Sequence, residues 1–142
     1  MSVRDDRHES LRQIVRTNKI STQKELVCAL QNEGFNATQG TVSRDIADLN
    51  LQKAQGVYVL PQDLHLSQLM HSLVTDIKCA QNQIIIHTQP GAAQSVAAAI
   101  DDAQLSGVLG SIAGDDTILV ISENDRKAQE FQGEITYFAT GL

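Results

Sequence analysis

Residues 34–49 read GFNATQGTVSRDIADL and contain the end of one helix, a short turn and most of another helix. Gly34 suits the left-handed residue that follows a helix, and Thr38 suits an N-cap. The apolar residues after this cap recur at i, i+4 and i+7, as Val42, Ile46 and Leu49. This spacing predicts a helix with one inward stripe. Two helices joined by a tight turn that contains glycine are typical of a helix-turn-helix.

The segments on either side extend this motif. His8–Thr17 has apolar residues at helical spacing, and Thr22 and Glu25 form a capping box that opens a second helix. Two short apolar runs, Leu51–Ala54 and Val57–Leu60, flank a Gln-Gly pair and predict a β-hairpin. Three helices followed by a hairpin indicate a winged helix.

The C-terminal half alternates strand and helix patterns in the order ββαββα. The expected elements are strands at Leu69–Cys79 and Gln83–Thr88, a helix at Ala92–Ala103, strands at Val108–Ala113 and Thr117–Ser122, and a helix at Asp125–Phe138. The fold class is therefore α+β, with one antiparallel-rich sheet covered by two helices in the C-terminal domain. We expect a winged helix-turn-helix in residues 1–62, a linker in 63–68 and the second domain in 69–142.

The charge is distributed unevenly. The net charge is −6, but residues 1–60 carry eight Lys/Arg and seven Asp/Glu, whereas residues 67–142 carry three and nine. The halves differ as expected if only the first approaches phosphate. The two cysteines lack the spacing of a zinc site or a disulfide framework, and no run reaches the ~18 apolar residues of a membrane helix. We expect a cytoplasmic protein without a membrane segment, metal or cofactor.

The outer face of the helix after Thr38 carries side chains that can read DNA. Gln39, Ser43 and Arg44 lie on or near this face, away from the inward stripe. Arg can bind guanine through two hydrogen bonds, Gln can pair with adenine, and Ser can bind a phosphate or a base. Periodicity alone leaves open a solvated helix face in a protein–protein module.

Two segments of the C-terminal half carry candidate ligand groups. His87–Gln94 lies where a strand becomes a helix, and free amides at a helix N-terminus suit a carboxylate. Asp101 lies two helical turns beyond Gln94, on the same face. Asp115 and Asp116 repel each other in a turn, and a guanidinium relieves that repulsion. On chemistry alone an ordinary βα loop is favoured, and a metal ion is a rival explanation for the two carboxylates.

Together these motifs resemble the bacterial arginine repressor family. The likeness rests on Gly34-Phe35, Thr38–Ile46 followed by Leu49, Leu51 and Lys53, His87–Gln94, Asp101, and Gly110–Ile118. It covers nearly the whole chain. The resemblance implies a transcription regulator of arginine metabolism genes, which binds double-stranded operator DNA with L-arginine as co-effector. It also implies trimers that pair into hexamers, with arginine between the trimers.

The resemblance also implies roles for individual residues. In the recognition helix, Ser43 and Arg44 would face the operator, with Gln39 and Thr41 at neighbouring contact positions. Lys53 is the single charge of a wing shorter than is usual in the family, so we expect DNA affinity to rest mainly on the helices.

For the effector, the likeness implies that Asp115 and Asp116 hold the guanidinium. Gln94 and Asp101 would serve the amino-acid end of the ligand, with Asp101 placed for the α-ammonium. The final helix resembles the family least, and no site is assigned to it.

Other classes of protein compete with this interpretation. His87, Ser111 and Asp115 supply the residue types of a hydrolase triad, but the chain has no G-x-S-x-G motif and no glycine-rich phosphate loop, so we expect no catalytic residue. A constitutive DNA-binding protein and a winged-helix regulator of another small molecule remain alternatives. The response of operator affinity to arginine separates them.

Overall fold

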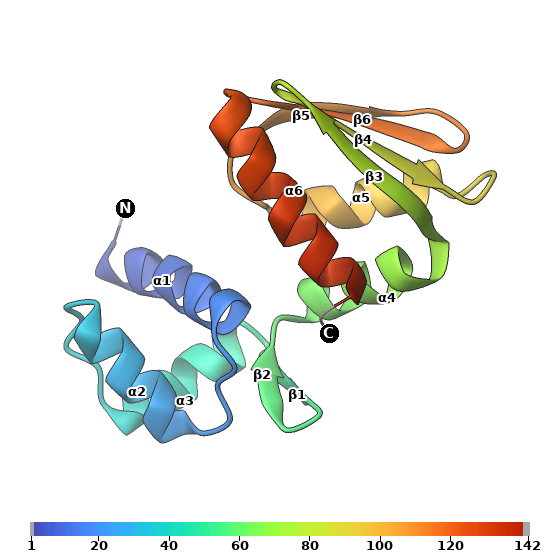
Figure 1. Cartoon of the computed structure of the whole chain (residues 1–142). Helices are drawn as coiled ribbons and strands as arrows, with labels where there is room; N and C mark the ends of the chain where they lie inside the picture. Colours follow the sequence, from blue (N-terminus) through green and yellow to red (C-terminus); the bar gives the residue numbers. More distant parts are fainter. Residues whose placement is uncertain (1, 141–142) are drawn as a thin grey trace. The chain divides into compact units, whose positions relative to one another are not determined.

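A computed structural model describes residues 2–140, and these form six helices and two antiparallel sheets (Figure 1). The chain divides into two compact units, the first ending at Pro61 and the second beginning at Gln62. Within the described residues, no helix is both long enough and apolar enough to cross a membrane.

The first unit is a winged helix-turn-helix, as the sequence predicts. Its elements are α1 (Val3–Thr17), α2 (Gln23–Asn32), α3 (Gln39–Asp48), β1 (Gln52–Ala54) and β2 (Val57–Val59). Helix α1 begins five residues before the predicted start at His8. The reason is a cap, because the Ser2 hydroxyl accepts a hydrogen bond from the Asp5 amide at 3.1 Å.

The turn between α2 and α3 is built from backbone hydrogen bonds. Gly34 has a φ of 91°, and the amide of Phe35 donates to the carbonyl of Leu30 at 3.0 Å, which is the long bond of a Schellman motif. The Thr38 hydroxyl then accepts from the Thr41 amide at 3.3 Å and caps α3. These bonds fix the direction in which α3 leaves α2.

The core of this unit is aliphatic, and the wing is attached to it. Its fully buried side chains include Leu11, Leu26, Leu30 and Val42. The hairpin turns at Gln55 and Gly56, whose φ values of 52° and 83° are those of a type I′ turn. The amide of Tyr58 donates to the carbonyl of Ile20 at 2.8 Å and anchors the wing to the segment between α1 and α2.

The second unit has the predicted order ββαββα, preceded by one further helix. Its elements are α4 (Pro61–Leu73), β3 (Val74–Ala80), β4 (Gln83–Thr88), α5 (Ala93–Ala103), β5 (Val108–Ala113), β6 (Thr117–Ser122) and α6 (Asp125–Thr140). The four strands are antiparallel in the order β3-β4-β6-β5. Helices α5 and α6 lie on the same face of the sheet (Figure 1). That face buries the side chains of Ile84, Ile86, Ile118 and Val120.

Helix α4 corrects two predictions. The expected linker at 63–68 lies inside α4, and the strand expected from Leu69 begins only at Val74. Pro61 is tolerated in the first turn of a helix, where its missing amide would have no intrahelical partner. The apolar residues that follow recur at i, i+3, i+4 and i+7, as Leu66, Leu69, Met70 and Leu73, and all four pack into the core of the second unit. That spacing belongs to a helix.

The opposite face of the sheet, which we call the outer face, carries apolar side chains on β4, β6 and β5. Strand register places on it the side chains of Ile85, Leu119, Ile121 and Ile112. Ile112 is 75% exposed, and Leu109, at the bulge of the edge strand β5, is 66% exposed. Contiguous exposed apolar surface is typical of interaction sites.

Candidate functional site

The outward face of α3 presents polar side chains to solvent. Gln39, Ser43 and Arg44 are exposed, and Thr41 is half-buried with its hydroxyl 3.1 Å from that of Thr38. Within residues 2–140 the guanidinium of Arg44 has no ion-pair partner. The side chains that the sequence assigned to DNA reading on α3 therefore occupy one accessible surface, with an unpaired cation among them.

The charged residue of the wing lies against its own hairpin. Lys53 on β1 is exposed and pairs across the hairpin with Tyr58 on β2, and its Nζ atom lies 5.0 Å from the centre of the Tyr58 ring. Such a cation–π contact contributes about 0.5–1 kcal/mol at an exposed site. The contact orders the lysine and leaves its ammonium accessible.

A buried carboxylate on the inner side of α3 escaped the sequence interpretation. The side chain of Asp45 is 1% exposed, and its two oxygens accept hydrogen bonds from Arg7 Nε at 2.6 Å and Arg7 Nη2 at 2.8 Å. Burial by itself would raise the pKa of Asp45, but the hydrogen bonds and charges of Arg7 and His8 outweigh it and hold the pKa below its ordinary value. The same pairing raises the pKa of Arg7. Asp45 is therefore ionised at neutral pH.

His8 and a second ion pair complete this network between α1 and α3. The Nε2 atom of His8 lies 2.9 Å from Asp45 Oδ1 and 3.8 Å from Asp48 Oδ2. An ionised carboxylate can only accept, so Nε2 carries the hydrogen and donates. Asp48 in turn accepts from Arg4 at 3.1 Å. The ligand atoms of His8, Asp45 and Asp48 lie within 4.8 Å of one another, but both Asp45 oxygens are already engaged, so the group is an ion-pair network.

The sequence contained a signal for this network. Asp45 lies at i+3 from Val42 and directly before Ile46, so it falls on the inward stripe of the predicted helix. A charged residue at such a position requires a partner. One partner, His8, lies at the predicted start of the first helix, and the other, Arg7, lies one residue before it and so outside the predicted helix.

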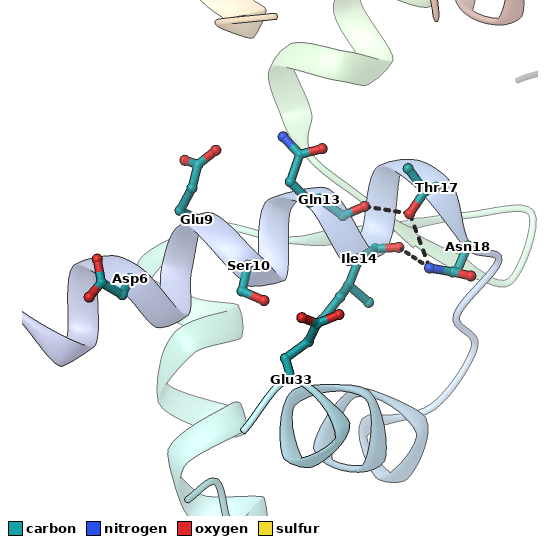
Figure 2. A pocket seen from close by; sticks show the side chains of 8 residues that line it. All are labelled: Asp6, Glu9, Ser10, Gln13, Ile14, Thr17, Asn18 and Glu33. Carbon is teal, nitrogen blue, oxygen red and sulfur yellow. Dashed lines mark hydrogen bonds between the residues drawn. The ribbon is translucent and has the colours of Figure 1, made fainter. Parts of the chain in front are cut away.

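A hollow of about 400 Å³ on the side of α1 away from the ion-pair network is lined by acidic side chains (Figure 2). Its lining includes the carboxylates of Asp6 and Glu9 on α1 and of Glu33 at the end of α2, and no Lys or Arg. Negative charge repels the phosphate backbone. This face is therefore unsuited to DNA, in contrast to the exposed face of α3.

In the second unit, the β5–β6 turn is hydrogen-bonded to the start of α5. The carbonyl of Asp115 accepts from the amides of Gly91 and Ala93 at 3.1 and 3.3 Å. The carbonyl of Asp116 accepts from the amide of Thr88 at 2.8 Å. Both aspartate side chains are exposed, so the backbone holds the turn while the carboxylates face solvent.

The four predicted ligand residues form two groups within one chain. Gln94 is exposed in the first turn of α5, beside the β5–β6 turn, and no side chain caps this helix at Ala92. Asp101 lies in the last turn, about 10 Å further along the helix axis. It lines a hollow of about 240 Å³ together with Val108 and Gly110, at the far end of β5. The structure thus brings Gln94 close to the two aspartates of the turn, and keeps Asp101 apart from them.

The residue types of a hydrolase triad do not assemble. The side chain of His87 lies on the outer face of the sheet, where its Nδ1 atom is 3.3 Å from Asp76 Oδ2. Ser111 lies in register with the buried Val120, on the helix-covered face. The two side chains are therefore on opposite sides of the sheet.

Comparison with known families matches both parts of the chain. The family model described as "Arginine repressor, DNA binding domain" matches residues 2–66, and "Arginine repressor, C-terminal domain" matches residues 70–137.

Similar proteins extend this match over most of the chain, and three that carry the name arginine repressor illustrate it. The protein from Acidobacterium capsulatum is 39% identical over 132 residues, which cover 87% of this chain and 89% of that protein. The protein from Carboxydothermus hydrogenoformans is 39% identical over 146 residues, covering 94% and 97%. The protein from Halothermothrix orenii is 36% identical over 140 residues, covering 90% and 93%.

Proposed function

The chain belongs to the arginine repressor family, whose members are DNA-binding transcription repressors and not enzymes, and we propose that it regulates arginine metabolism genes with L-arginine as its effector. The observation that carries the proposal is the exposed face of α3. This face combines the Arg44 guanidinium, which has no ion-pair partner in the described part of the chain, with amide and hydroxyl groups, on a helix whose other side is buried. A protein that binds bacterial operators would act in the cytoplasm.

In this proposal α3 enters the major groove of double-stranded DNA. Arg44 binds guanine through its two-pronged donor set, and Gln39 and Ser43 contact adenine or phosphate. Thr41 lies at the protein surface beside them and completes the contact set. Lys53 contributes one phosphate contact from the wing, which adds affinity without adding sequence information.

The proposed arginine site begins at the β5–β6 turn. Asp115 and Asp116 bind the guanidinium, because the planar fork of donors matches carboxylate oxygens and cancels the repulsion between them. Gln94 and the first-turn amides of α5, which no side chain caps, face the amino-acid end of the ligand. Since Asp101 lies at the other end of α5, we propose that a second copy of the chain supplies the Asp101 that binds the α-ammonium.

A site shared between copies requires an oligomer, and the outer face of the sheet supports one. Exposed Leu109 and Ile112 continue the apolar surface of β4 and β6, and burying it would stabilise a small domain. We propose trimers that pair into hexamers when arginine binds between them. Several α3 helices then bind one DNA segment together, which multiplies weak single-domain contacts through effective concentration.

The test starts from a pool of random duplexes from which the purified full chain selects its binding sequence with L-arginine present. Affinity for the selected duplex is then measured without an amino acid, with L-arginine and with L-lysine. We expect arginine alone to tighten binding, because the lysine ammonium lacks a planar fork. Equal affinity in all three conditions would indicate a constitutive DNA-binding protein. A response to a different amino acid would replace the effector.

A further inference from the structure

We infer that Asp45, held by Arg7 and His8, is a positioning residue that fixes the rotation of α3 about its own axis and thereby aims the DNA-reading side chains. The inference deepens the proposed DNA-binding function and rests on it. It assigns a part in sequence recognition to three residues that do not lie on the reading face.

Apolar packing alone defines the rotation of α3 weakly. Val42 is the one apolar side chain of this helix that is fully buried, and Ile46 is half-buried. The backbone of α3 lies close to that of α2, whereas α1 reaches α3 mainly through side chains. Hydrophobic contact is non-directional, so one fully buried valine and the partly buried Ile46 and Leu49 fix the rotation of this ten-residue helix less tightly than hydrogen bonds do.

The hydrogen bonds to Asp45 are directional and remove that freedom. Arg7 presents two nitrogen donors in a rigid plane, at 2.6 and 2.8 Å from the two carboxylate oxygens, and His8 adds a third contact at 2.9 Å. A carboxylate bound through both oxygens cannot turn away without breaking charge-assisted bonds. With the Asp45 side chain 1% exposed, no water is at hand to replace those bonds.

Helix geometry links this inner anchor to the reading face. Successive residues are about 100° apart around an α-helix, so Ser43 lies about 200° from Asp45 and Arg44 about 100° from it. Holding Asp45 toward α1 therefore directs Ser43 outward. Side-chain atoms lie about 5–6 Å from the axis, so a roll of about 10° moves them by about 1 Å. A displacement of that size exceeds the range of distances that a base contact tolerates.

The same network also neutralises the negative charge that α3 carries. Helix α3 carries two carboxylates, and α1 supplies a cation to each, Arg7 to Asp45 and Arg4 to Asp48. If the network acted only by neutralising charge, disrupting it would weaken binding to every DNA sequence alike. If it also positions α3, disrupting it while keeping the charge weakens binding to the preferred sequence alone.

The decisive pair of variants is Arg7→Lys and its control Arg12→Lys. Arg12 lies on the same helix and pairs with Glu9 at 3.1 Å, within α1. Both substitutions keep the charge of the chain, so the phosphate-dependent affinity should not change. The readout is the affinity of the whole 142-residue chain for two duplexes, measured with L-arginine at one salt concentration. One is the duplex selected by the wild type, and the other has the same bases in scrambled order.

We expect Arg7→Lys to lower affinity for the selected duplex by about tenfold, as for the loss of one good base contact, and to leave the scrambled duplex within about twofold. Arg12→Lys should leave both affinities unchanged. Equal losses on both duplexes, or no loss on either, would overturn the positioning role while DNA binding stands. Failure of the wild type to select any sequence would overturn the proposed function and this inference with it.

Thermal unfolding shows whether Arg7→Lys is folded at the assay temperature. If it is not, three further substitutions, at Asp45 and His8, test the same inference. Asp45→Asn removes a negative charge, so a purely electrostatic role predicts tighter binding to both duplexes. Positioning predicts weaker binding to the selected duplex alone.

His8→Ala should reproduce the loss of affinity for the selected duplex, and His8→Gln should restore most of that affinity, because the Gln amide nitrogen can donate from nearly the position of Nε2. Equal behaviour of the Ala and Gln variants would contradict the inference.

Discussion

Replacing Asp115 with asparagine tests the proposed effector site most directly. The substitution keeps the shape of the side chain and removes the charge that would oppose a guanidinium. It should leave the fold intact, because the hydrogen bonds that hold the turn are accepted by the Asp115 carbonyl, from Gly91 and Ala93. We therefore expect the free energy of unfolding without ligand to change by less than about 0.5 kcal/mol.

The effect on arginine binding follows from the contact that is lost. A hydrogen bond to a charged group contributes about 1.5–3 kcal/mol, and the lower end applies to a carboxylate that is exposed in the single chain. Arginine affinity should fall by about tenfold or more, since about 1.4 kcal/mol corresponds to a factor of ten. Because the two adjacent carboxylates no longer repel each other, the ligand-free oligomer should be no weaker than that of the wild type.

The assays are calorimetric titration with arginine and sedimentation velocity with and without it. Asp102→Asn is the matched control, because it removes the same charge from an exposed position on α5. By linkage, a ligand that favours the larger oligomer must bind that oligomer more tightly, so both readouts should change together. If arginine binds and assembles Asp115→Asn as it does the wild type, the proposed site is wrong.

Four shorter predictions address the reading helix, the wing, the ion-pair network and the outer face of the sheet. Arg44→Ala should weaken binding to the selected duplex by about 1–3 kcal/mol, and equal affinity at matched salt would exclude Arg44 from base reading. Lys53→Ala should reduce the salt slope by at most about one unit per bound domain, and an unchanged slope and affinity would exclude the wing as a phosphate contact. Because the pKa of Asp45 is lowered in the folded state, its stabilising contribution is present above the ordinary value of 3.8 and is lost as the pH falls through the lower folded pKa. Acid unfolding followed by circular dichroism should therefore be steeper below about pH 4 for the wild type than for Asp45→Asn, and parallel curves would contradict this reasoning. Ile112→Asp should leave the fold unchanged and shift sedimentation toward smaller species, and an unchanged sedimentation profile would remove the outer face from the assembly.

Local signals in the sequence predicted much of the first unit. Gly34 ends α2 with a positive φ, and Thr38 caps α3 through the Thr41 amide. Each of these features depends on residues close together in the chain. The capping box at α2 was half correct, because Thr22 accepts from the Glu25 amide, but the Glu25 carboxylate accepts from the Thr22 hydroxyl instead of its amide.

Interactions between distant residues were harder to predict. Asp45 pairs with Arg7, 38 positions away, and pairing at that distance leaves no periodic trace in the sequence. Helix α4 was missed for another reason, since its apolar spacing was present but an initial proline and polar residues favoured a linker. For the effector residues, helical spacing correctly placed Gln94 and Asp101 two turns apart. It did not show that the turn after β5 lies at only one end of that helix.

The arginine site proposed at the β5–β6 turn has a consequence for how ligand preference can evolve. The hydrogen bonds that join the turn to the start of α5 and the segment before it are accepted by the backbone carbonyls of Asp115 and Asp116, which every amino acid possesses. The Asp116 carboxylate accepts a hydrogen bond from the hydroxyl of the neighbouring Thr117. Mutation at these two positions can therefore change the charge, size or hydrogen-bonding character presented to a ligand while the scaffold persists. A lineage could drift toward a new metabolite without first losing its fold, and a library randomised at these two codons is a compact starting point for engineering sensors of other small molecules.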